Sequence, residues 1–348
     1  MQQPGFFDLD ERYTKLSKQG DPLEALDATI VWSTFRPVLK KLQKRTRKSN
    51  AGRKPYDVIL MFKLLVLQSL YNLSDEQVEF QVRDRLSFMR FLGLSLEDRI
   101  PDATTLWLFR ESLIEQGLIE PLFKQFNHYL DEQGYEARKG QIIDATIVPV
   151  PKQRNSREEN QAIKAGEIPE NWEEQPNKLG QKDTQARWTK KHNKSYYGYK
   201  NHVDIDNQHK LIRRYRTTDA SVHDSQVLGE LIDPDNSNAD VWADSAYRSQ
   251  ETERELKSNG YRSHIHHKGK RNQPLSEHKQ VVNQKRSAIR ARVEHVFGYQ
   301  ENSMGGKLIR TIGLARASAK IGLMNLGYNM KRLVYLKKQQ SRVIASIA

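Results

Sequence analysis

The sequence predicts two kinds of structure in succession: an all-α N-terminal region, then an α/β region in which helices flank a mixed sheet. Before residue 135, apolar residues recur at helical spacing. After Gly140 they alternate with polar ones and are rich in Ile, Val, Tyr and Thr, as strands are. A strand–helix–strand stretch also follows a hairpin, which combines parallel and antiparallel pairing in one sheet. The 348 residues are enough for about two domains.

Helices account for the first third of the chain. The segment 24–43 has apolar residues at roughly helical spacing, and 56–73 is apolar on most faces, which is typical of a buried helix. Between them, residues 36–54 hold nine Lys or Arg and no acid. The stretch from Gly52 to Pro55 should break any helix there.

Two further helices are predicted before residue 117. Ser74 begins a capping-box pattern, so one helix should start there and continue to about Phe91. Asp102 is the expected N-cap of a helix over 103–116 that ends at Gly117. A helix, a turn and a second helix are compatible with a DNA-binding helix-turn-helix motif, and also with two helices that simply pack together in a bundle.

Five strands are predicted, at 141–148, 195–206, 210–220, 239–244 and 261–267. A link of hairpin length joins the second to the third, and the helical segment 249–260 joins the fourth to the fifth. The stretch 152–194 interrupts this pattern with acids early, bases late and few apolar residues, so we expect a charged surface insertion, partly disordered. Helices return at 289–300 and 314–336.

The charge of the chain indicates a polyanionic partner. It has 57 Lys and Arg against 43 Asp and Glu, a net charge of +14, and residues 286–348 alone carry +10. The absence of cysteine excludes a disulfide framework, a thiol nucleophile and a Cys-based zinc site. The N-terminal residues lack a signal-peptide pattern and no apolar stretch approaches the ~20 residues of a membrane helix, so we expect a cytoplasmic, nucleoid-associated protein.

Two aspartates occupy unusual places in predicted strands. Asp144 lies in the middle of the first strand and shares a face with Ile142 and Val148, where an apolar side chain belongs. Such a buried anion needs a metal, an Arg or backbone donors. Asp244 ends the fourth strand, where ligands of α/β sheets gather, although an Asp there also suits the N-cap of the next helix.

Glu294 is the third candidate acid. It lies beside the apolar stripe of the helix 289–300, and its alternative role is a surface ion pair with Arg290 four residues earlier. Two Asp on strands and one Glu on a later helix can converge as an oxygen-only site for hard divalent cations. Two such ions can activate an attacking oxygen and stabilise a leaving one during phosphoryl transfer.

The order and wording of several segments resemble the DDE transposases of bacterial insertion sequences, in the group called IS family five. The resemblance covers about residues 50–336 and rests on segments such as "DATIVPVPKQRNSREEN", "TDASVHDSQVL", "VWADSAYRS", "RARVEHVFG" and "NSMGGKLIRTIGLARA". It implies an RNase H-like fold whose catalytic, metal-binding acids are Asp144, Asp244 and Glu294. It also implies two Mg²⁺ ions, with Mn²⁺ able to substitute.

The wider class has a Tyr–Arg–Glu–Lys signature that this chain matches only in part. Arg290 and Glu294 fit, whereas Ser287 stands at the Tyr place and Glu301 at the Lys place. The resemblance therefore leaves the roles of that Tyr and Lys unassigned, with Lys307 or Arg310 as substitutes for the Lys.

The resemblance also implies the partners: double-stranded DNA, both the terminal inverted repeats and the target, bound by a homodimer without a nucleotide cofactor. The predicted DNA-binding residues are Arg53, Lys54, Lys190, Lys191, Lys200, Arg248, Arg286, Arg290, Arg292, Lys307 and Arg310. The predicted divisions are an N-terminal helical and basic segment at 1–48, a helical DNA-end-binding domain at 49–135, the catalytic domain at 140–336 and a tail at 337–348.

The predicted activity is metal-dependent DNA strand cleavage followed by strand transfer. Two alternatives stay open at this point: a metal-dependent nuclease or resolvase of the same fold that cuts without joining, and a DNA-binding derivative whose acids are inert. The presence of all three acids argues against the second.

Overall fold

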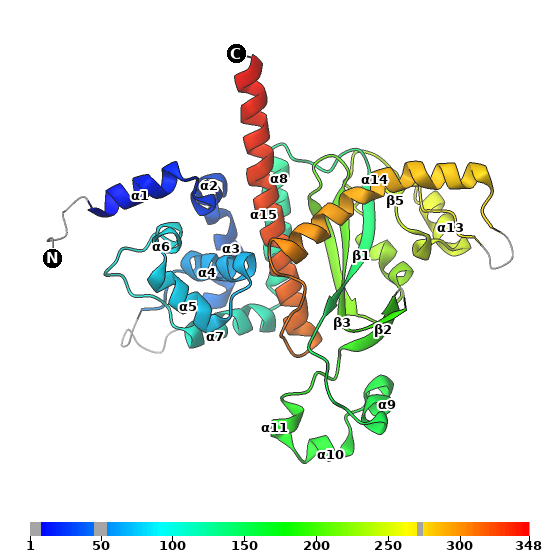
Figure 1. Ribbon diagram of the computed structural model, residues 1–348, viewed down its shortest axis with the longest axis horizontal. Coiled ribbons are helices and arrows are strands. Elements are labelled where there is room, and N and C mark those ends of the chain that lie inside the picture. Colours follow the sequence, from blue (N-terminus) through cyan, green and yellow to red (C-terminus); the bar gives the residue numbers. More distant parts are fainter. Residues whose placement is uncertain (1–7, 45–53, 192, 270–273, 348) are drawn as a thin grey trace. The chain divides into compact units, whose positions relative to one another are not determined.

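The computed structural model describes residues 8–44, 54–191, 193–269 and 274–347 and divides into two compact units (Figure 1). The first consists of Met1–Tyr129 with Leu326–Ala348, and the second of Leu130–Asn325. Two helices, α8 (Ile119–Glu132) and α15 (Leu314–Ile347), have residues in both units.

The first unit is helical, as predicted. Besides parts of α8 and α15, its helices are α1 (Asp8–Lys18), α2 (Pro22–Thr29), α3 (Arg36–Leu39), α4 (Val58–Tyr71), α5 (Asp75–Asp84), α6 (Leu86–Leu92) and α7 (Ala103–Glu115), with 3₁₀ turns η1 (Trp32–Phe35) and η2 (Lys40–Lys44). The expected caps are present: Ser74 and Gln77 form a capping box, and Asp102 caps α7 through the amide of Thr105.

Two predicted helices are broken. The helix over 24–43 is wrong because the chain turns extended at Ile30, and Pro37, which has no amide hydrogen, sits at the start of the next short helix. The helix expected to reach Phe91 breaks at Arg85, which is extended. In a continuous helix Arg85 would follow Val78 and Val82 on the buried stripe, so the break keeps a cation out of the core.

The α4 helix forms the core of the first unit, as its composition predicts, and most of its side chains are buried. Its single cation, Lys63, is compensated: Nζ lies 2.6 Å from Asp27 Oδ1 and 2.8 Å from the carbonyl oxygen of Phe91. Among the described residues, no single helix is long and apolar enough to span a membrane; α4 and α5 meet that test only as a pair, bent by 101°.

The second unit is built on a six-stranded mixed sheet. Its strands are β1 (Gln141–Pro149), β2 (Arg187–Lys191), β3 (Lys194–Asp206), β4 (Ile212–Asp219), β5 (Asp240–Trp242) and β6 (Arg262–Ser263). The order is β2-β3-β1-β5-β6, with β4 also paired to β3. β3 is antiparallel to its partners, whereas β5 is parallel to β1 and β6. The mixed sheet is confirmed, and the strand expected over 261–267 is shorter than predicted.

Helices cover the sheet. They are α12 (Leu228–Leu231), α13 (Gln250–Ser258), α14 (Glu277–Asn302) and the first part of α15, which carries Ile321, with the 3₁₀ turns η3 (Asp224–Val227) and η4 (Ser245–Tyr247). Ile143 packs with Leu231 and Leu256 on one face of the sheet, while Val148 packs with Ile321 on the other. Because side chains alternate along β1, Asp144 belongs to the second face, which α14 approaches.

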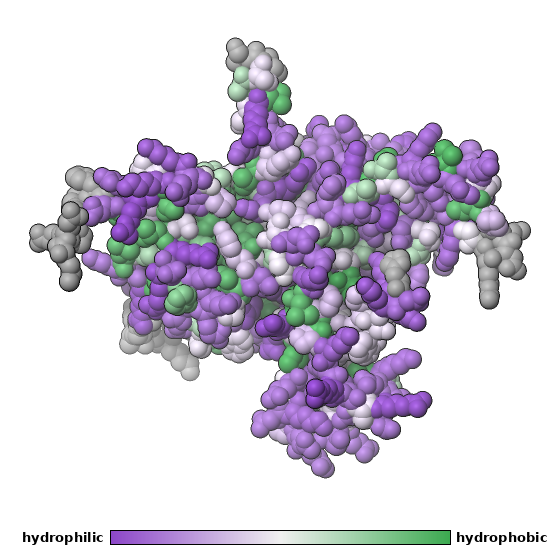
Figure 2. All heavy atoms as spheres, viewed as in Figure 1, coloured by the Kyte–Doolittle hydropathy of each residue, from purple (hydrophilic) through white to green (hydrophobic). Residues whose placement is uncertain are grey.

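The insertion at 152–194 has more structure than its composition predicts. It contains α9 (Arg157–Ala165), α10 (Glu170–Glu173) and α11 (Pro176–Leu179), which lie beyond the carboxyl end of β1 (Figure 1). Trp172 is completely buried there and donates from Nε1 to Glu159 at 2.6 Å. The expectation of partial disorder gave too little weight to this tryptophan, which supplies a small core. The surface of the insertion seen in Figure 2 is mainly hydrophilic.

Asp183 connects the end of this insertion to the sheet. Its buried carboxylate accepts hydrogen bonds from the Tyr199 hydroxyl at 2.7 Å, from the amides of Gln185 and Ala186 at 2.9 Å, and from the amide of Gly313 at 3.2 Å. One side chain therefore joins three segments that are far apart in the sequence.

We predict that Asp183→Ala lowers the free energy of unfolding by about 3 kcal/mol, because several buried donors lose their acceptor at once. Tyr199→Phe removes only one of these bonds and should cost about 1 kcal/mol. Thermal unfolding of both variants measures the difference. Equal melting temperatures for the two variants would show that Asp183 does not organise this junction.

Candidate functional site

The parallel pairing of β1 and β5 brings two of the predicted acids together. Gln141 pairs with Val241 and Ile142 with Trp242. Asp144 lies two residues beyond the second pair, still within β1, and Asp244 lies two residues beyond it on the other side, just after β5 ends. Paired strands are about 4.8 Å apart, so the register directs the two acids to the same region. The negative charge of Asp244 accordingly contributes to raising the pKa of Asp144.

The carboxylate of Asp144 is largely buried, and the positive charge around it does not fully offset the cost of that burial. Its Oδ1 accepts from the amide of Ala145 at 2.8 Å, and its Oδ2 accepts from Arg290 at 2.7 Å. Burial nevertheless raises its pKa to about 6, with Arg290 and the Ala145 amide opposing that rise and Asp244 adding to it. A bound cation would lower this cost.

Asp244 fulfils both of the roles considered for it. It follows the end of β5, and its Oδ1 caps η4 by accepting from the amide of Ala246 at 2.7 Å. The cap fixes the orientation of the carboxylate at the carboxyl end of the strand, which is where ligands of such sheets bind.

The third acid, Glu294, is linked to Asp144 through Arg290. Val293 and Val296 anchor α14 in the core, and Arg290 reaches Asp144 with one terminal nitrogen and Glu294 with the other, at 3.6 Å. The expected ion pair between Arg290 and Glu294 is therefore present. The side chain of Glu294 is 65% exposed, whereas that of Asp144 is 13% exposed.

The donor set suits a hard divalent cation, because all three acids supply oxygen and Asp144 pays a burial cost that positive charge would reduce. Within the described ranges, however, no three Asp, Glu or His side chains lie close enough together to hold a metal ion as they stand. The guanidinium of Arg290 lies against both Asp144 and Glu294. Asp144 and Asp244 fit such an ion directly, and Glu294 would fit after Arg290 moves.

Lys200, predicted to contact DNA, lies inside the protein. Its Nζ donates to Asp224 Oδ1 at 2.8 Å and to the carbonyl oxygen of Val222 at 2.7 Å, and its side chain is 12% exposed. The pair holds the loop before η3, which packs against η4 and hence against the segment that carries Asp244. This internal ion pair, rather than an exposed cation, is what the structure shows at Lys200.

Two residues near the acids were not singled out from the sequence. Tyr247 is fully buried, and its hydroxyl has no hydrogen-bond partner among the described residues. Burial raises its pKa far above the usual value, and Asp144, Asp224 and Asp244 all add to the rise, so three acids surround one phenol. The only sequence signal was its place three residues after Asp244.

The second such residue is His202, which lies opposite Ala145 in the β1–β3 pairing and is fully buried. Its Nε2 is 2.9 Å from the Thr218 hydroxyl, and its Nδ1 is 4.0 Å from Asp224. Burial lowers its pKa to about 4, although Asp224 opposes that change.

The other predicted DNA-binding residues divide by exposure. Arg248 and Arg286 both donate to the carbonyl oxygen of Ile265, and Arg292 donates to that of Asn207. The exposed ones are Lys54, Lys190, Lys191, Lys307 and Arg310. Lys307 lies 3.6 Å from Glu301. Arg53 lies outside the described residues.

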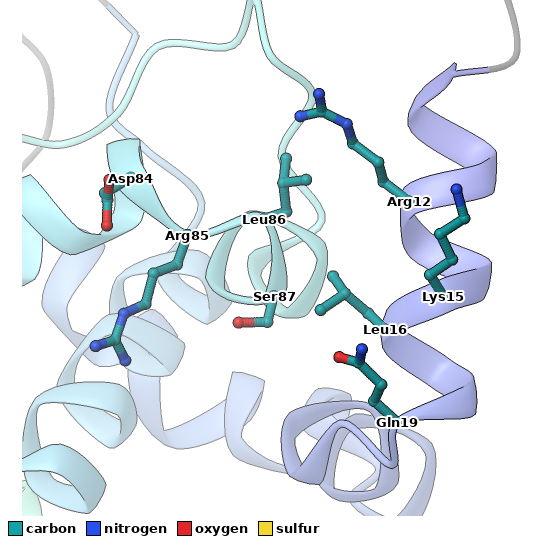
Figure 3. Close-up of a pocket in the computed structure, with 8 residues that line it drawn as sticks. All are labelled: Arg12, Lys15, Leu16, Gln19, Asp84, Arg85, Leu86 and Ser87. Atoms are coloured by element: carbon teal, nitrogen blue, oxygen red, sulfur yellow. The ribbon is translucent and has the colours of Figure 1, made fainter.

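The first unit contains a shallow groove of about 430 Å³ with a cationic rim (Figure 3). Leu16 of α1 and Gln19, just after that helix, point towards the start of α6, which carries Leu86 and Ser87, whereas the guanidinium of Arg85 points away from α1 (Figure 3). Because these side chains do not converge on one point, the groove has no evident anchor for a small ligand.

Residues 136–330, more than half of the chain, match the family model described as "Transposase DDE domain". The chain belongs to the DDE transposase family. Its residues 11–112 match the model "Transposase domain (DUF772)". The predicted transposase activity is thereby confirmed: enzymes of this family catalyse DNA cleavage and strand transfer and depend on divalent metal ions. Neither model distinguishes IS family five from other insertion-sequence groups.

A solved structure is also similar, titled "Cryo-EM structure of piggyBac transposase synaptic complex with hairpin DNA (SNHP)". It is 12% identical, with a TM-score of 0.45, over 92% of this chain and 76% of that chain. At this distance the likeness says nothing about individual residues of the transposase.

The buried His202 predicts how the stability of the transposase depends on pH. The folded protein keeps this histidine neutral down to about pH 4, whereas the unfolded chain binds a proton below about pH 6.5. The contribution of neutral His202 to the free energy of unfolding is therefore complete above pH 6.5. It is lost as the pH falls towards 4, by at most about 1.4 kcal/mol per pH unit.

Thermal unfolding of the wild type and His202→Gln between pH 4 and pH 8 measures this effect. We expect the variant to lose less stability than the wild type on acidification, while His278→Gln, at an exposed position on α14, follows the wild type. Parallel curves for wild type and His202→Gln would refute the assignment.

Proposed function

We propose that Asp144, Asp244 and Glu294 form the catalytic site of this transposase. The single observation that supports this most strongly is the parallel pairing of β1 with β5, which brings Asp144 of β1 near Asp244 just after β5, while Arg290 of α14 links Asp144 to Glu294. In this proposal the site cuts the ends of the mobile element and joins the resulting 3′-hydroxyl to target DNA.

The three acids would hold two divalent cations, Mg²⁺ or Mn²⁺, and bound ions of this kind activate an attacking oxygen and stabilise a leaving oxygen. The protein supplies their positions. The cap on Ala246 fixes the orientation of Asp244, and the amide of Ala145 fixes that of Asp144. Burial of Asp144 keeps bulk water from screening the interaction between its charge and that of a cation.

We further propose that the sheet of the second unit is RNase H-like and that the enzyme belongs to IS family five. Its substrates would be double-stranded DNA, both terminal inverted repeats and target, synapsed by a homodimer in the cytoplasm on nucleoid DNA. The helices of the first unit would recognise the ends. The support is the basic charge of the chain, +14, and the helices α5 and α7, which lie on either side of α6 in the sequence and each begin at a well-formed cap.

Asp144→Asn tests the catalytic assignment. We expect cleavage of DNA carrying the inverted repeats that flank the gene to fall by about a hundredfold or more, because even indirect partners of metal ligands cost 10–100-fold when removed. Binding of the same DNA in a gel-shift assay should persist. Glu251→Gln, at an exposed position on α13, serves as the matched control and should cut normally.

A cleavage rate equal to that of the wild type in Asp144→Asn would exclude this site. Supplying a supercoiled plasmid as target distinguishes a transposase from a nuclease of the same fold, since only strand transfer produces joined DNA.

The exposed end of β2 predicts a phosphate-binding surface. Lys190 and Lys191 are exposed, and Lys191 is close enough to Asp144 to influence its pKa. The double variant Lys190→Gln/Lys191→Gln should bind DNA more weakly whatever the sequence, with a salt dependence shallower by about 2 in the slope of log K against log salt. The control variant Arg254→Gln/Lys257→Gln, on α13, should keep the wild-type slope. If both double variants changed the slope equally, Lys190 and Lys191 would not form a specific phosphate-binding surface.

A further inference from the structure

We infer that Arg290 acts as a placeholder for the catalytic cation and makes cation binding conditional on DNA. This inference rests on the proposed function, since it concerns the same acids. Without DNA, the guanidinium would neutralise Asp144 and Glu294 and exclude a metal ion; a DNA phosphate would draw it away and open the site.

The geometry is that of a shared guanidinium. Arg290 reaches Asp144 Oδ2 at 2.7 Å and Glu294 Oε1 at 3.6 Å with its two terminal nitrogens. The two carboxylates thus contact one cationic group, and within the described ranges the acids do not form a ready metal cluster. A metal ion bound to Asp144 and Glu294 at the ~2.1 Å typical of Mg²⁺ would need the same oxygen atoms and would repel the guanidinium.

The hydrogen bonding of Arg290 is incomplete. Its Nε is buried and has no hydrogen-bond partner among the residues that the structure describes. An arginine that leaves one donor unused is not in its most stable arrangement, since a buried unsatisfied donor costs free energy. Phosphate oxygens suit arginine better, because two parallel hydrogen bonds can form at once.

Neighbouring arginines on α14 differ in what holds them. Arg286 donates to the carbonyl oxygen of Ile265 and Arg292 to that of Asn207, both parts of the protein backbone. Releasing Arg286 leaves that carbonyl oxygen to Arg248, which also donates to it, and releasing Arg292 removes a donor from the carbonyl oxygen of Asn207. A divalent cation would replace neither interaction. Releasing Arg290 instead leaves two carboxylates, which a divalent cation can satisfy. Arg290 is therefore the arginine whose departure a metal ion compensates.

Thermodynamic linkage makes the consequence measurable without any reaction. If DNA removes Arg290 from the acids, DNA must strengthen cation binding, and the cation must strengthen DNA binding by the same factor. Arg292→Gln provides a matched control on the same helix, because this arginine does not contact the acids.

The experiment is a Mn²⁺ titration of the full chain followed by the electron paramagnetic resonance signal of free Mn²⁺. For DNA-free protein, we expect Arg290→Gln to bind Mn²⁺ about tenfold more tightly than the wild type, within the usual range of coupling energies, and Arg292→Gln to match the wild type. Adding a duplex of the inverted repeat that flanks the gene should tighten Mn²⁺ binding by the wild type and have a smaller effect on Arg290→Gln.

Unchanged or weaker Mn²⁺ binding by folded Arg290→Gln would overturn the inference, as would a wild-type Mn²⁺ affinity that DNA leaves unaltered. The comparison of wild-type Mn²⁺ affinity with and without DNA needs no variant, so it tests the inference even if Arg290→Gln fails to fold. If Asp144→Asn abolishes cleavage while either result is found, the proposed catalytic site stands and only the placeholder role fails. If Asp144→Asn cuts normally, the proposed function itself fails.

Discussion

The parallel pairing between β1 and β5 is the constraint on which the proposed catalytic arrangement depends, because a slip of one residue would turn Asp144 to the opposite face of the sheet. Gly140 helps to fix this register. A Cβ at that position would lie 2.5 Å from the ring of Trp242 and 2.6 Å from the carbonyl oxygen of Asp240. Asn236 completes the junction by bonding both the amide and the carbonyl of Gly140. A glycine immediately before β1 therefore allows the close approach of the chain to Asp240 and Trp242 of β5.

Placing several acids close together costs electrostatic free energy, and two ion pairs in the second unit reduce that cost. Arg290 reaches Asp144 from α14, and Lys200 reaches Asp224 from β3. Both ion pairs are largely buried, so removing one partner would leave an uncompensated charge. The raised pKa of Asp144 shows that the compensation is only partial. A site whose negative charge is only partly compensated favours divalent cations, and enzymes of this family depend on such ions.

Much of this could be predicted from the sequence, and the failures have physical causes. Alternation along one strand identified Asp144, and the position after a short buried strand identified Asp244, because both signals are local. The ion pair of Lys200 could not be predicted, because its partner, Asp224, comes from a loop after the next strand and only the folded chain brings the two together. Likewise, periodicity places Arg85 on the stripe of Val78 and Val82, but it does not tell whether the helix breaks there or the side chain finds a partner, and the structure breaks the helix.

The most direct test of the shared acidic site is to locate Mn²⁺ by anomalous scattering in crystals of the transposase bound to its end DNA. We predict anomalous density within ~2.2 Å of carboxylate oxygens of both Asp144 and Asp244, with Glu294 joining them and Arg290 turned to a phosphate. Density at other acids, with Asp144 still paired to Arg290, would contradict the assignment.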